Sequence, residues 1–302
     1  MTAAMTDVAR GLAVCPLDRR SLVWGAEQAT CDTCGARYDV KDGILVLVPP
    51  TNDAHKREQA AFFDDETDPE FEVRRPYGAP RLYQRLMEEK LERSLRGFPG
   101  GIDGWTALVV CGGSGMDGAL LAELGARVVA SDISLGAARR VAERARRSGQ
   151  PLTPVVADVE HLPFADRSFD LVYVHDGLHH LEDPRVGIAE MARVAARGVS
   201  ISEPAVAAVT HLAVRLGLAL ELEEAGNLVR RLTLEEISRE LSQVGLRTVH
   251  AERYAMYYKH EPGRLVTLLS AAGAADLAIA GFRVANRALG GFGNKLSVQA
   301  VR

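Results

Sequence analysis

The stretch Ala107-Leu-Val-Val-Cys-Gly-Gly-Ser-Gly115 places a short apolar run directly before a glycine-rich turn. The apolar run at 107–110 predicts a buried strand, and the pattern at 118–124 predicts a helix immediately after the turn. Glycines in such a turn allow tight geometry and close approach of a ligand, while the helix N-terminus presents free N–H groups. The stretch therefore predicts a strand–turn–helix unit that binds a cofactor.

Outward from this unit, short apolar runs alternate with helical stretches, as is typical of stacked βαβ units. The predicted strands are 107–110, 127–131, 153–156, 171–174, 198–202, 247–258 and 295–301. The predicted helices are 82–95, 118–124, 135–147, 184–196, 206–223, 233–244 and 263–289. We expect an α/β fold: a doubly wound, seven-stranded Rossmann-like sheet with an antiparallel last strand, helical cap insertions and a small N-terminal β-ribbon.

Three regions that differ in composition and sequence pattern suggest the domain organisation. Residues 1–50 combine short apolar runs, turns and three cysteines, which predicts a small ribbon-like module. Residues 51–104 are polar and helical in pattern and are expected to form a lid or linker. Residues 105–302 form the expected α/β domain, with insertions at 205–232 and 261–291. A length of 302 residues suits one large domain and a small appendage.

Composition narrows the classes of partner. Hydrophobic residues make up 47% of the chain and charged residues 25%, so an ordered globular protein is expected. The formal net charge of -4 disfavours nucleic acid as a partner, because phosphate neutralisation dominates such binding. A small molecule is the expected partner, and the chain is expected to be a monomer or a homodimer.

The N-terminal segment and the apolar stretches of the chain suggest its cellular compartment. Residues 1–20 carry Asp and Arg without a long apolar run, which does not fit a secretory signal. No stretch of about 20 uncharged apolar residues predicts a membrane span, so no membrane partner is expected. The most apolar candidate, 265–280, is interrupted by Asp276 and is interpreted as a buried or partner-facing helix. We expect a cytoplasmic protein.

A second motif, Val128-Val-Ala-Ser-Asp-Ile-Ser134, ends the second predicted strand with an acid. Asp132 lies roughly 20 residues beyond the glycine turn, where an acidic residue accepts hydrogen bonds from ribose hydroxyls. The two motifs together predict a cofactor that contains a ribose.

A third element distinguishes between such cofactors. The run Val156-Ala-Asp-Val-Glu-His-Leu-Pro-Phe-Ala-Asp-Arg-Ser-Phe-Asp-Leu-Val-Tyr-Val174 is followed by His179-His-Leu-Glu-Asp-Pro184 and Ile201-Ser-Glu-Pro204. This series resembles the motif set of the UbiE-like, "type 11" branch of class I S-adenosylmethionine-dependent methyltransferases. The resemblance covers about 106–204 and returns at the last strand. It implies S-adenosylmethionine as the cofactor.

The resemblance also implies residue roles. Gly113 and Gly115 approach the methionine moiety, Asp132 holds the ribose and Asp158 meets the adenine. For Asp158 a helix or turn cap is the alternative. The full expected cofactor-binding set is Gly112, Gly113, Gly115, Asp117, Asp132, Ile133, Asp158, Val159 and His175.

The first motif departs from the family pattern at two positions. The family carries an acid on the first strand and a glycine two residues later, where this chain has Val109 and Cys111. The missing acid weakens the expected hold on the amino group of the cofactor, and Asp117 in the next helix is a candidate replacement. Cys111 is interpreted as a small residue that fills the turn rather than as a nucleophile.

The N-terminal cysteines lie on two knuckle-like turns, Cys15-Pro-Leu-Asp18 and Cys31-Asp-Thr-Cys34. They resemble the zinc-ribbon module found in front of some methyltransferases, which implies Cys15, Asp18, Cys31 and Cys34 as metal ligands. A Cys3Asp set can hold a structural zinc ion. The alternative is a packed β-ribbon that has lost its metal.

Candidates for chemistry cluster after the fourth strand. His175 and His179 are the expected catalytic residues, since histidine suits proton transfer near neutral pH. A structural role in the turn is the alternative for His179 and His180. Tyr77, Tyr254 and Tyr258 are the expected substrate-binding residues, with ordinary packing as the alternative.

The expected function is transfer of a methyl group from S-adenosylmethionine to an oxygen or nitrogen of a small molecule, in specialised metabolism. One alternative is an rRNA guanine methyltransferase, because some of these enzymes also carry a zinc ribbon before the same core. The other is a non-catalytic cofactor-binding regulatory or partner protein, which the altered first motif supports.

Overall fold

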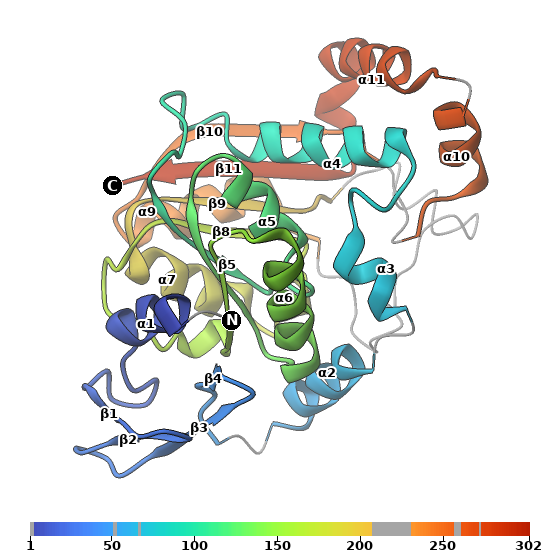
Figure 1. Cartoon of the computed structure of the whole chain (residues 1–302). Coiled ribbons are helices and arrows are strands. Elements are labelled where there is room, and N and C mark those ends of the chain that lie inside the picture. Colours follow the sequence, from blue (N-terminus) through green and yellow to red (C-terminus); the bar gives the residue numbers. More distant parts are fainter. Residues whose placement is uncertain (1–2, 51–52, 66–67, 207–230, 257–260, 272) are drawn as a thin grey trace.

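A computed structural model describes all residues except 1–2, 51–52, 66–67, 207–230, 257–260 and 272 (Figure 1). Its strands form one mixed sheet in the order β1-β2-β3-β4-β7-β6-β5-β8-β9-β11-β10. The strands are β1 (Leu22–Trp24), β2 (Gln28–Cys31), β3 (Arg37–Lys41), β4 (Ile44–Val46), β5 (Thr106–Val110), β6 (Arg127–Asp132), β7 (Leu152–Val156), β8 (Phe169–His175), β9 (Ala195–Pro204), β10 (Arg247–Tyr254) and β11 (Lys295–Val301).

The seven strands from β5 to β11 correspond to the seven predicted ones, and the Rossmann-like α/β fold is confirmed. Strands β7, β6, β5, β8 and β9 run parallel, and β11 pairs antiparallel with both β9 and β10. The sheet as a whole has eleven strands rather than seven. The excess arises because β4 pairs in parallel with β7 at Leu45↔Val155, which adds the ribbon strands to an otherwise open edge.

Helices cover both faces of the central strands, and the strand residues alternate between the two faces (Figure 1). Leu108 and Val110 pack on the side of α1 (Ala3–Leu12), α7 (Pro184–Val194) and α9 (Leu234–Gln243). Ala107 and Val109 pack on the side of α4 (Arg81–Ser94), α5 (Met116–Glu123) and α6 (Leu135–Ser148). The near-continuous apolar sequence of β5 follows from this burial on both sides.

The segment before the core forms α2 (Ala54–Asp64), α3 (Pro69–Arg74) and α4. Short 3-10 helices lie at Val159–His161, Leu178–His180 and Gly290–Phe292. The predicted strand 247–258 ends at Tyr254 as β10, and the predicted helix 206–223 lies almost entirely outside the described residues.

The predicted helical stretch 263–289 consists of two helices, α10 (Arg264–Ala271) and α11 (Ala275–Leu289). Gly273 separates them with a φ of +68°, which is a conformation that interrupts a right-handed helix. Among the described residues no single helix is long and apolar enough to cross a membrane. Helix α10 and the segment Ala275–Phe292 reach that length and apolarity only as a pair bent by 119°.

Candidate functional site

The glycine turn between β5 and α5 leaves room for a ligand at one position and is closely packed at another. Gly113 and Gly115 have φ values of +51° and +77°, a region that favours glycine. A Cβ on Gly115 would lie 2.9 Å from Cγ2 of Val141, whereas nothing in the described part of the chain lies within 4 Å of a Cβ placed on Gly113. Gly115 is therefore required by packing, and Gly113 faces open space.

Asp132, the last residue of β6, connects the turn to the neighbouring strand. Its carboxylate accepts the N–H of Gly113 at 2.8 Å and the N–H of Ser134 at 3.0 Å. Burial raises the pKa of Asp132 above its usual value, although these N–H donors oppose the rise. With Ile133 it lines a cavity of about 200 Å³ at the carboxyl ends of the strands, where Rossmann-like sheets bind ligands.

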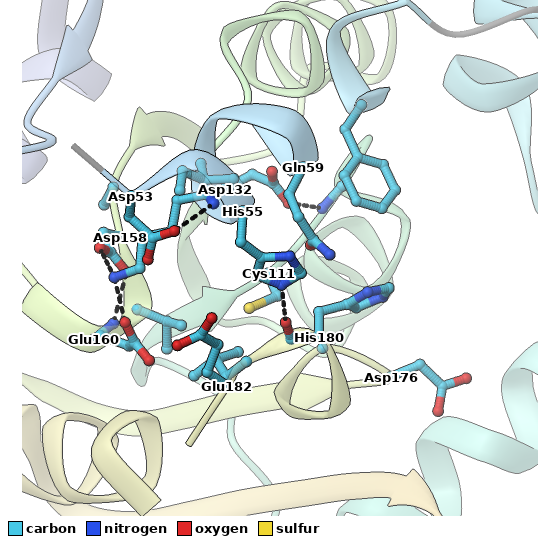
Figure 2. Close-up of a pocket in the computed structure, with 18 residues that line it drawn as sticks. Asp53, His55, Gln59, Cys111, Asp132, Asp158, Glu160, Asp176, His180 and Glu182 are labelled. Atoms are coloured by element: carbon cyan, nitrogen blue, oxygen red, sulfur yellow. Dashed lines mark hydrogen bonds and ion pairs between the residues drawn. The ribbon is translucent and has the colours of Figure 1, made fainter. Parts of the chain in front are cut away.

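Asp158, which also lines this first cavity, has two distinct sets of contacts (Figure 2). One carboxylate oxygen accepts the N–H of Glu160 at 2.9 Å and caps the short helix that begins at Val159. The other accepts a hydrogen bond from Nζ of Lys56 at 2.7 Å. Burial would lower the pKa of Lys56, but its bonds to Asp158 and Glu160 raise it. Asp158 therefore caps the short helix with one carboxylate oxygen, as the sequence alternative predicted, and its contact with Lys56 holds the other oxygen at the cavity wall.

Helix α2 closes the first cavity from outside the core. Nε2 of His55 lies 3.1 Å from the carbonyl oxygen of His180. At the other end of the helix, Asp64 accepts the hydroxyl of Ser134 and the N–H of Gly136, both at 2.7 Å. The sequence predicted a helical lid here but named neither Lys56 nor His55, because contacts between segments this far apart leave no local pattern.

A second, more polar cavity of about 420 Å³ adjoins the first. The two share Cys111, Gly113, Asp176 and His180 in their walls. The remaining lining residues of the second cavity are Arg75, Lys90, Gly112, Met116, Asp117, His175, His179, Pro204 and Lys295. The glycine turn therefore stands between two adjacent cavities.

A buried charge cluster forms one wall of the second cavity. Lys90 of α4 is 1% exposed, and its Nζ lies 2.6 Å from Oδ1 of Asp117 and 3.4 Å from Nδ1 of His175. Burial lowers the pKa of Lys90, while Lys90 and His175 keep the pKa of Asp117 below its usual value despite burial. Burial also lowers the pKa of His175 to about 4, so this imidazole is neutral at pH 7.

A second buried group joins β9 to the turn after β8. Glu203 is fully buried, and one of its oxygens accepts the N–H groups of Gly177 and Leu178 at 2.9 and 2.8 Å. The other lies 2.8 Å from Nδ1 of His179, which is itself 3% exposed. This arrangement fixes the orientation of the His179 ring at the cavity wall.

The ligand atoms of Asp176, His179 and Glu203 lie within 4.8 Å of one another, as in a metal site. These three side chains nevertheless already form other contacts. Glu203 binds three N–H groups, and Lys295 forms an ion pair with Asp176. These contacts favour a hydrogen-bonded cluster over a metal site.

Cys111 borders both cavities at the position where the family pattern has glycine. Its φ is +50°, and a Cβ on Gly177 would lie 2.4 Å from the Cβ of Cys111, so the cysteine packs tightly against that turn. Burial raises the pKa of the Cys111 thiol well above its usual value. The thiol is therefore protonated at neutral pH, which fits a packing role better than a nucleophilic one.

The structure does not bring the expected substrate-binding tyrosines together at the cavities. Tyr77 is 52% exposed and donates a hydrogen bond to Glu123. Tyr254 is fully buried, with the guanidinium of Arg93 4.9 Å from its ring centre. Neither lines a described cavity, and Tyr258 lies outside the described residues. Their role in substrate binding stays a prediction.

The four predicted metal ligands converge in the ribbon. One ligand atom from each of Cys15, Asp18, Cys31 and Cys34 lies within 4.8 Å of the others. The Sγ atoms of Cys15 and Cys34 are 3.6 Å apart, and Sγ of Cys31 is 3.4 Å from the Asp18 carboxylate. Three thiols and one carboxylate at these spacings fit a tetrahedral zinc site.

Comparison with known proteins supports the sequence resemblance. A family model described as "Methyltransferase domain" matches residues 108–213. The demethylmenaquinone methyltransferase of Renibacterium salmoninarum is 34% identical over 149 residues, which are 48% of this chain and 57% of that protein. The chain thus covers little more than half the length of this relative.

Solved structures share the fold. The magnesium protoporphyrin IX methyltransferase of Synechocystis PCC 6803, with bound SAH, superposes with a TM-score of 0.54 at 17% identity, covering 82% of this chain and 99% of that one. A geranyl diphosphate methyltransferase superposes with a TM-score of 0.55 at 15% identity, covering 83% and 100%. At these identities the similarity shows the fold alone.

Proposed function

Because the chain contains a class I S-adenosylmethionine-dependent methyltransferase domain, we propose that it transfers the methyl group of S-adenosylmethionine to an oxygen or nitrogen of a small molecule. The observation that carries the proposal is the meeting of two cavities at Cys111 and Gly113. A donor that spans the turn would keep its adenosine in the first cavity and present its methyl group to the second.

The polar groups on each side suit the two ends of this cofactor. Asp132 can accept bonds from ribose hydroxyls, and Asp158 with the backbone at Val159 can bind the adenine. On the other side, Asp117 offers a carboxylate to the methionine ammonium, while Arg75 and Lys90 offer cations to its carboxylate. Asp117 thereby replaces the acid that the first strand lacks.

Of the two predicted catalytic histidines, His179 is the better candidate for a base. A base works best when its pKa lies near the working pH, and burial lowers the pKa of His175 to about 4. His179 also lines the second cavity, and its Nδ1 lies 2.8 Å from Glu203, which fixes the orientation of the ring toward an acceptor bound there. Glu203 would act as its positioning residue.

A small-molecule acceptor is favoured over RNA. The relatives are named for methylation of demethylmenaquinone, which is a small molecule, and the net charge of -4 opposes binding to a polyanion. The rRNA methyltransferase and the non-catalytic protein remain as outcomes that the following experiment distinguishes.

The experiment incubates the protein and methyl-labelled S-adenosylmethionine with a host extract, which is then separated into RNA, protein and small-molecule fractions. We expect label in the small-molecule fraction with the wild type and with the exposed-site control Asp166→Ala, but not with Asp132→Ala. Label in nuclease-sensitive material would indicate the rRNA enzyme instead. Tight cofactor binding without transfer to any fraction would indicate a non-catalytic protein.

We also propose that Cys15, Asp18, Cys31 and Cys34 hold a structural zinc ion, supported by the convergence of their ligand atoms. Protein produced with added zinc should contain one zinc per chain by elemental analysis. Cys31→Ser should lose the metal, whereas Cys111→Ser, outside the cluster, should keep it. Wild-type protein without zinc would contradict the proposal.

A further inference from the structure

The helices α10 and α11 expose an unusual number of large apolar side chains. We call these side chains the apolar outer face: Leu265, Leu268, Leu277, Val284, Leu289 and Phe292. Each is between 61% and 77% exposed, whereas no large apolar side chain elsewhere in the described part of the chain exceeds 55%. Exposed patches of this kind usually mark an interaction surface.

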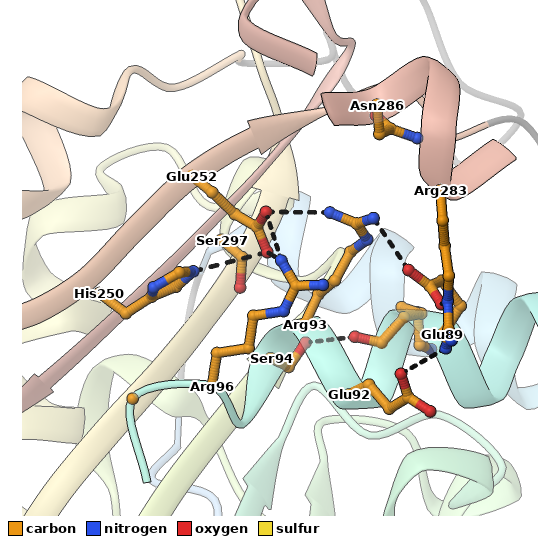
Figure 3. A network of polar contacts seen from close by, with 12 residues as sticks. Glu89, Glu92, Arg93, Ser94, Arg96, His250, Glu252, Arg283, Asn286 and Ser297 are labelled. Atoms are coloured by element: carbon orange, nitrogen blue, oxygen red, sulfur yellow. Dashed lines mark hydrogen bonds and ion pairs between the residues drawn. The ribbon is translucent and has the colours of Figure 1, made fainter. Parts of the chain in front are cut away.

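The side of α11 that faces the protein combines the buried apolar residues Ala275 and Ile279 with polar contacts, which Figure 3 shows. Arg283 donates to Glu89 at 2.5 Å and to Glu92 at 2.6 Å. Asn286 exchanges two hydrogen bonds with the backbone of Ala255, at 2.7 and 3.1 Å. A surface helix normally turns its apolar side inward and its polar side to water. In α11 the inward side does carry apolar residues, but Leu277 and Val284 remain 77% and 63% exposed, so packing against the core does not account for the apolar outer face.

The charge of the segment fits an anionic surface. Residues 264–292 contain Arg264, Arg283 and Arg287 against a single acid, Asp276, a net charge of +2 in a chain whose net charge is -4. Asp276 is paired with Arg85 at 2.9 Å, while Arg264 and Arg287 are exposed. An apolar face flanked by arginines is the pattern of a helix that lies in the interface of an anionic bilayer.

The shape of the segment favours a bilayer over a second copy of the chain. The two helices lie at the periphery of the molecule, outside α4 (Figure 1), and are bent at a break rather than continuous. A fluid lipid surface can adapt to such a projecting, bent ridge. Two copies meeting through it would bring their exposed arginines together and repel each other.

The segment also adjoins the acceptor side of the site. Helix α11 packs against α4, which carries Lys90, and Lys295 follows Phe292 by three residues. Both lysines line the second cavity. The apolar outer face is therefore linked to the wall of the second cavity through α4 and the start of β11.

We propose that the apolar outer face docks the protein peripherally on an anionic phospholipid bilayer. The sequence predicted no membrane partner because it carries no spanning segment, but interfacial docking does not require one. The docking does not depend on the proposed methyl transfer, so the two can fail separately.

The test measures co-sedimentation of the full chain with vesicles of 70% phosphatidylcholine and 30% phosphatidylglycerol, and with pure phosphatidylcholine. We expect binding to the anionic vesicles that weakens at high salt and falls at least tenfold in the double variant Leu277→Glu/Phe292→Glu. The matched double variant Leu17→Glu/Leu124→Glu, at exposed apolar positions elsewhere, should bind as the wild type does. Far-ultraviolet circular dichroism and cofactor affinity check that both variants fold.

Two results would overturn the proposal. One is equal sedimentation of the wild type and the Leu277→Glu/Phe292→Glu variant. The other is a wild-type dimer in light scattering that this variant dissociates, with no vesicle binding, which would assign the face to a second copy of the chain.

Discussion

The two cavities on either side of the glycine turn are built in different ways. The first is organised by backbone: Asp132 and Asp158 each accept N–H groups from residues close to strand ends. The second is lined mainly by polar and charged side chains from α4, α5, β8 and β11, which neutralise one another, and Glu203 of β9 orients His179 in its wall. This difference suggests that local structure forms the part of the site that would bind a common cofactor. Long-range packing forms the part that would bind a particular acceptor.

The largest expected effect concerns the wall of the second cavity. Glu203→Ala leaves three buried N–H groups without their acceptor, so the free energy of unfolding should fall by about 4 kcal/mol in urea denaturation. Glu203→Gln should recover part of this loss, because the amide oxygen can still accept. The exposed-site control Glu27→Ala should stay within about 0.5 kcal/mol of the wild type. If Glu203→Ala matched that control, Glu203 would not stabilise this wall of the second cavity.

The next effect concerns the backbone-organised side. Asp132→Ala removes the acceptor of the Gly113 and Ser134 N–H groups together with the proposed ribose contact. Affinity for S-adenosylmethionine by calorimetry should fall about 100-fold, or about 2.7 kcal/mol. A loss below threefold would show that the carboxylate only shapes the turn.

The dependence of stability on pH tests the buried charges of the second cavity. Burial lowers the pKa of His175 from its usual 6.5 to about 4, so between these values the unfolded chain binds a proton that the folded chain does not. Stability should therefore fall as the pH decreases through this window, by ~2 kcal/mol between about pH 7 and about pH 5. His175→Gln should flatten that part of the curve in urea denaturation. An unchanged curve would mean that the pKa of His175 is the same in the folded and unfolded states.

The smallest expected effect concerns the lid helix. Lys56→Met leaves Asp158 and Glu160 without their cation and weakens the attachment of α2. Affinity for S-adenosylmethionine should fall about tenfold, with faster amide exchange in α2. Lys41→Met, at a half-exposed surface position, should change neither quantity. Tighter binding in Lys56→Met would show instead that Lys56 competes with the adenine for Asp158.

Sequence patterns predicted the secondary structure correctly where residues close together in the sequence determine it. The seven core strands and most of the helices formed where periodicity predicted them. The differences have two causes: the stretch 263–289 breaks at Gly273 through the local backbone conformation of a glycine, whereas the ribbon extends the sheet through the tertiary pairing of Leu45 with Val155. The ligand atoms of the four residues that the zinc-ribbon resemblance implied also lie close together, although metal binding itself stays a prediction.

The sequence by itself indicated the fold and a ribose-containing cofactor, because a strand, a glycine turn and an acid at the next strand end act through adjacent backbone and leave a recognisable pattern. S-adenosylmethionine in particular was implied by the family resemblance of the motifs between Val156 and Pro204. Only the tertiary structure decided which charges face one another. Lys56 with Asp158, Lys90 with His175, and Asp176 with Lys295 come from segments far apart in the chain. Their pairing depends on how helices and strands pack, so it cannot be predicted from a pattern among residues that are close in the sequence.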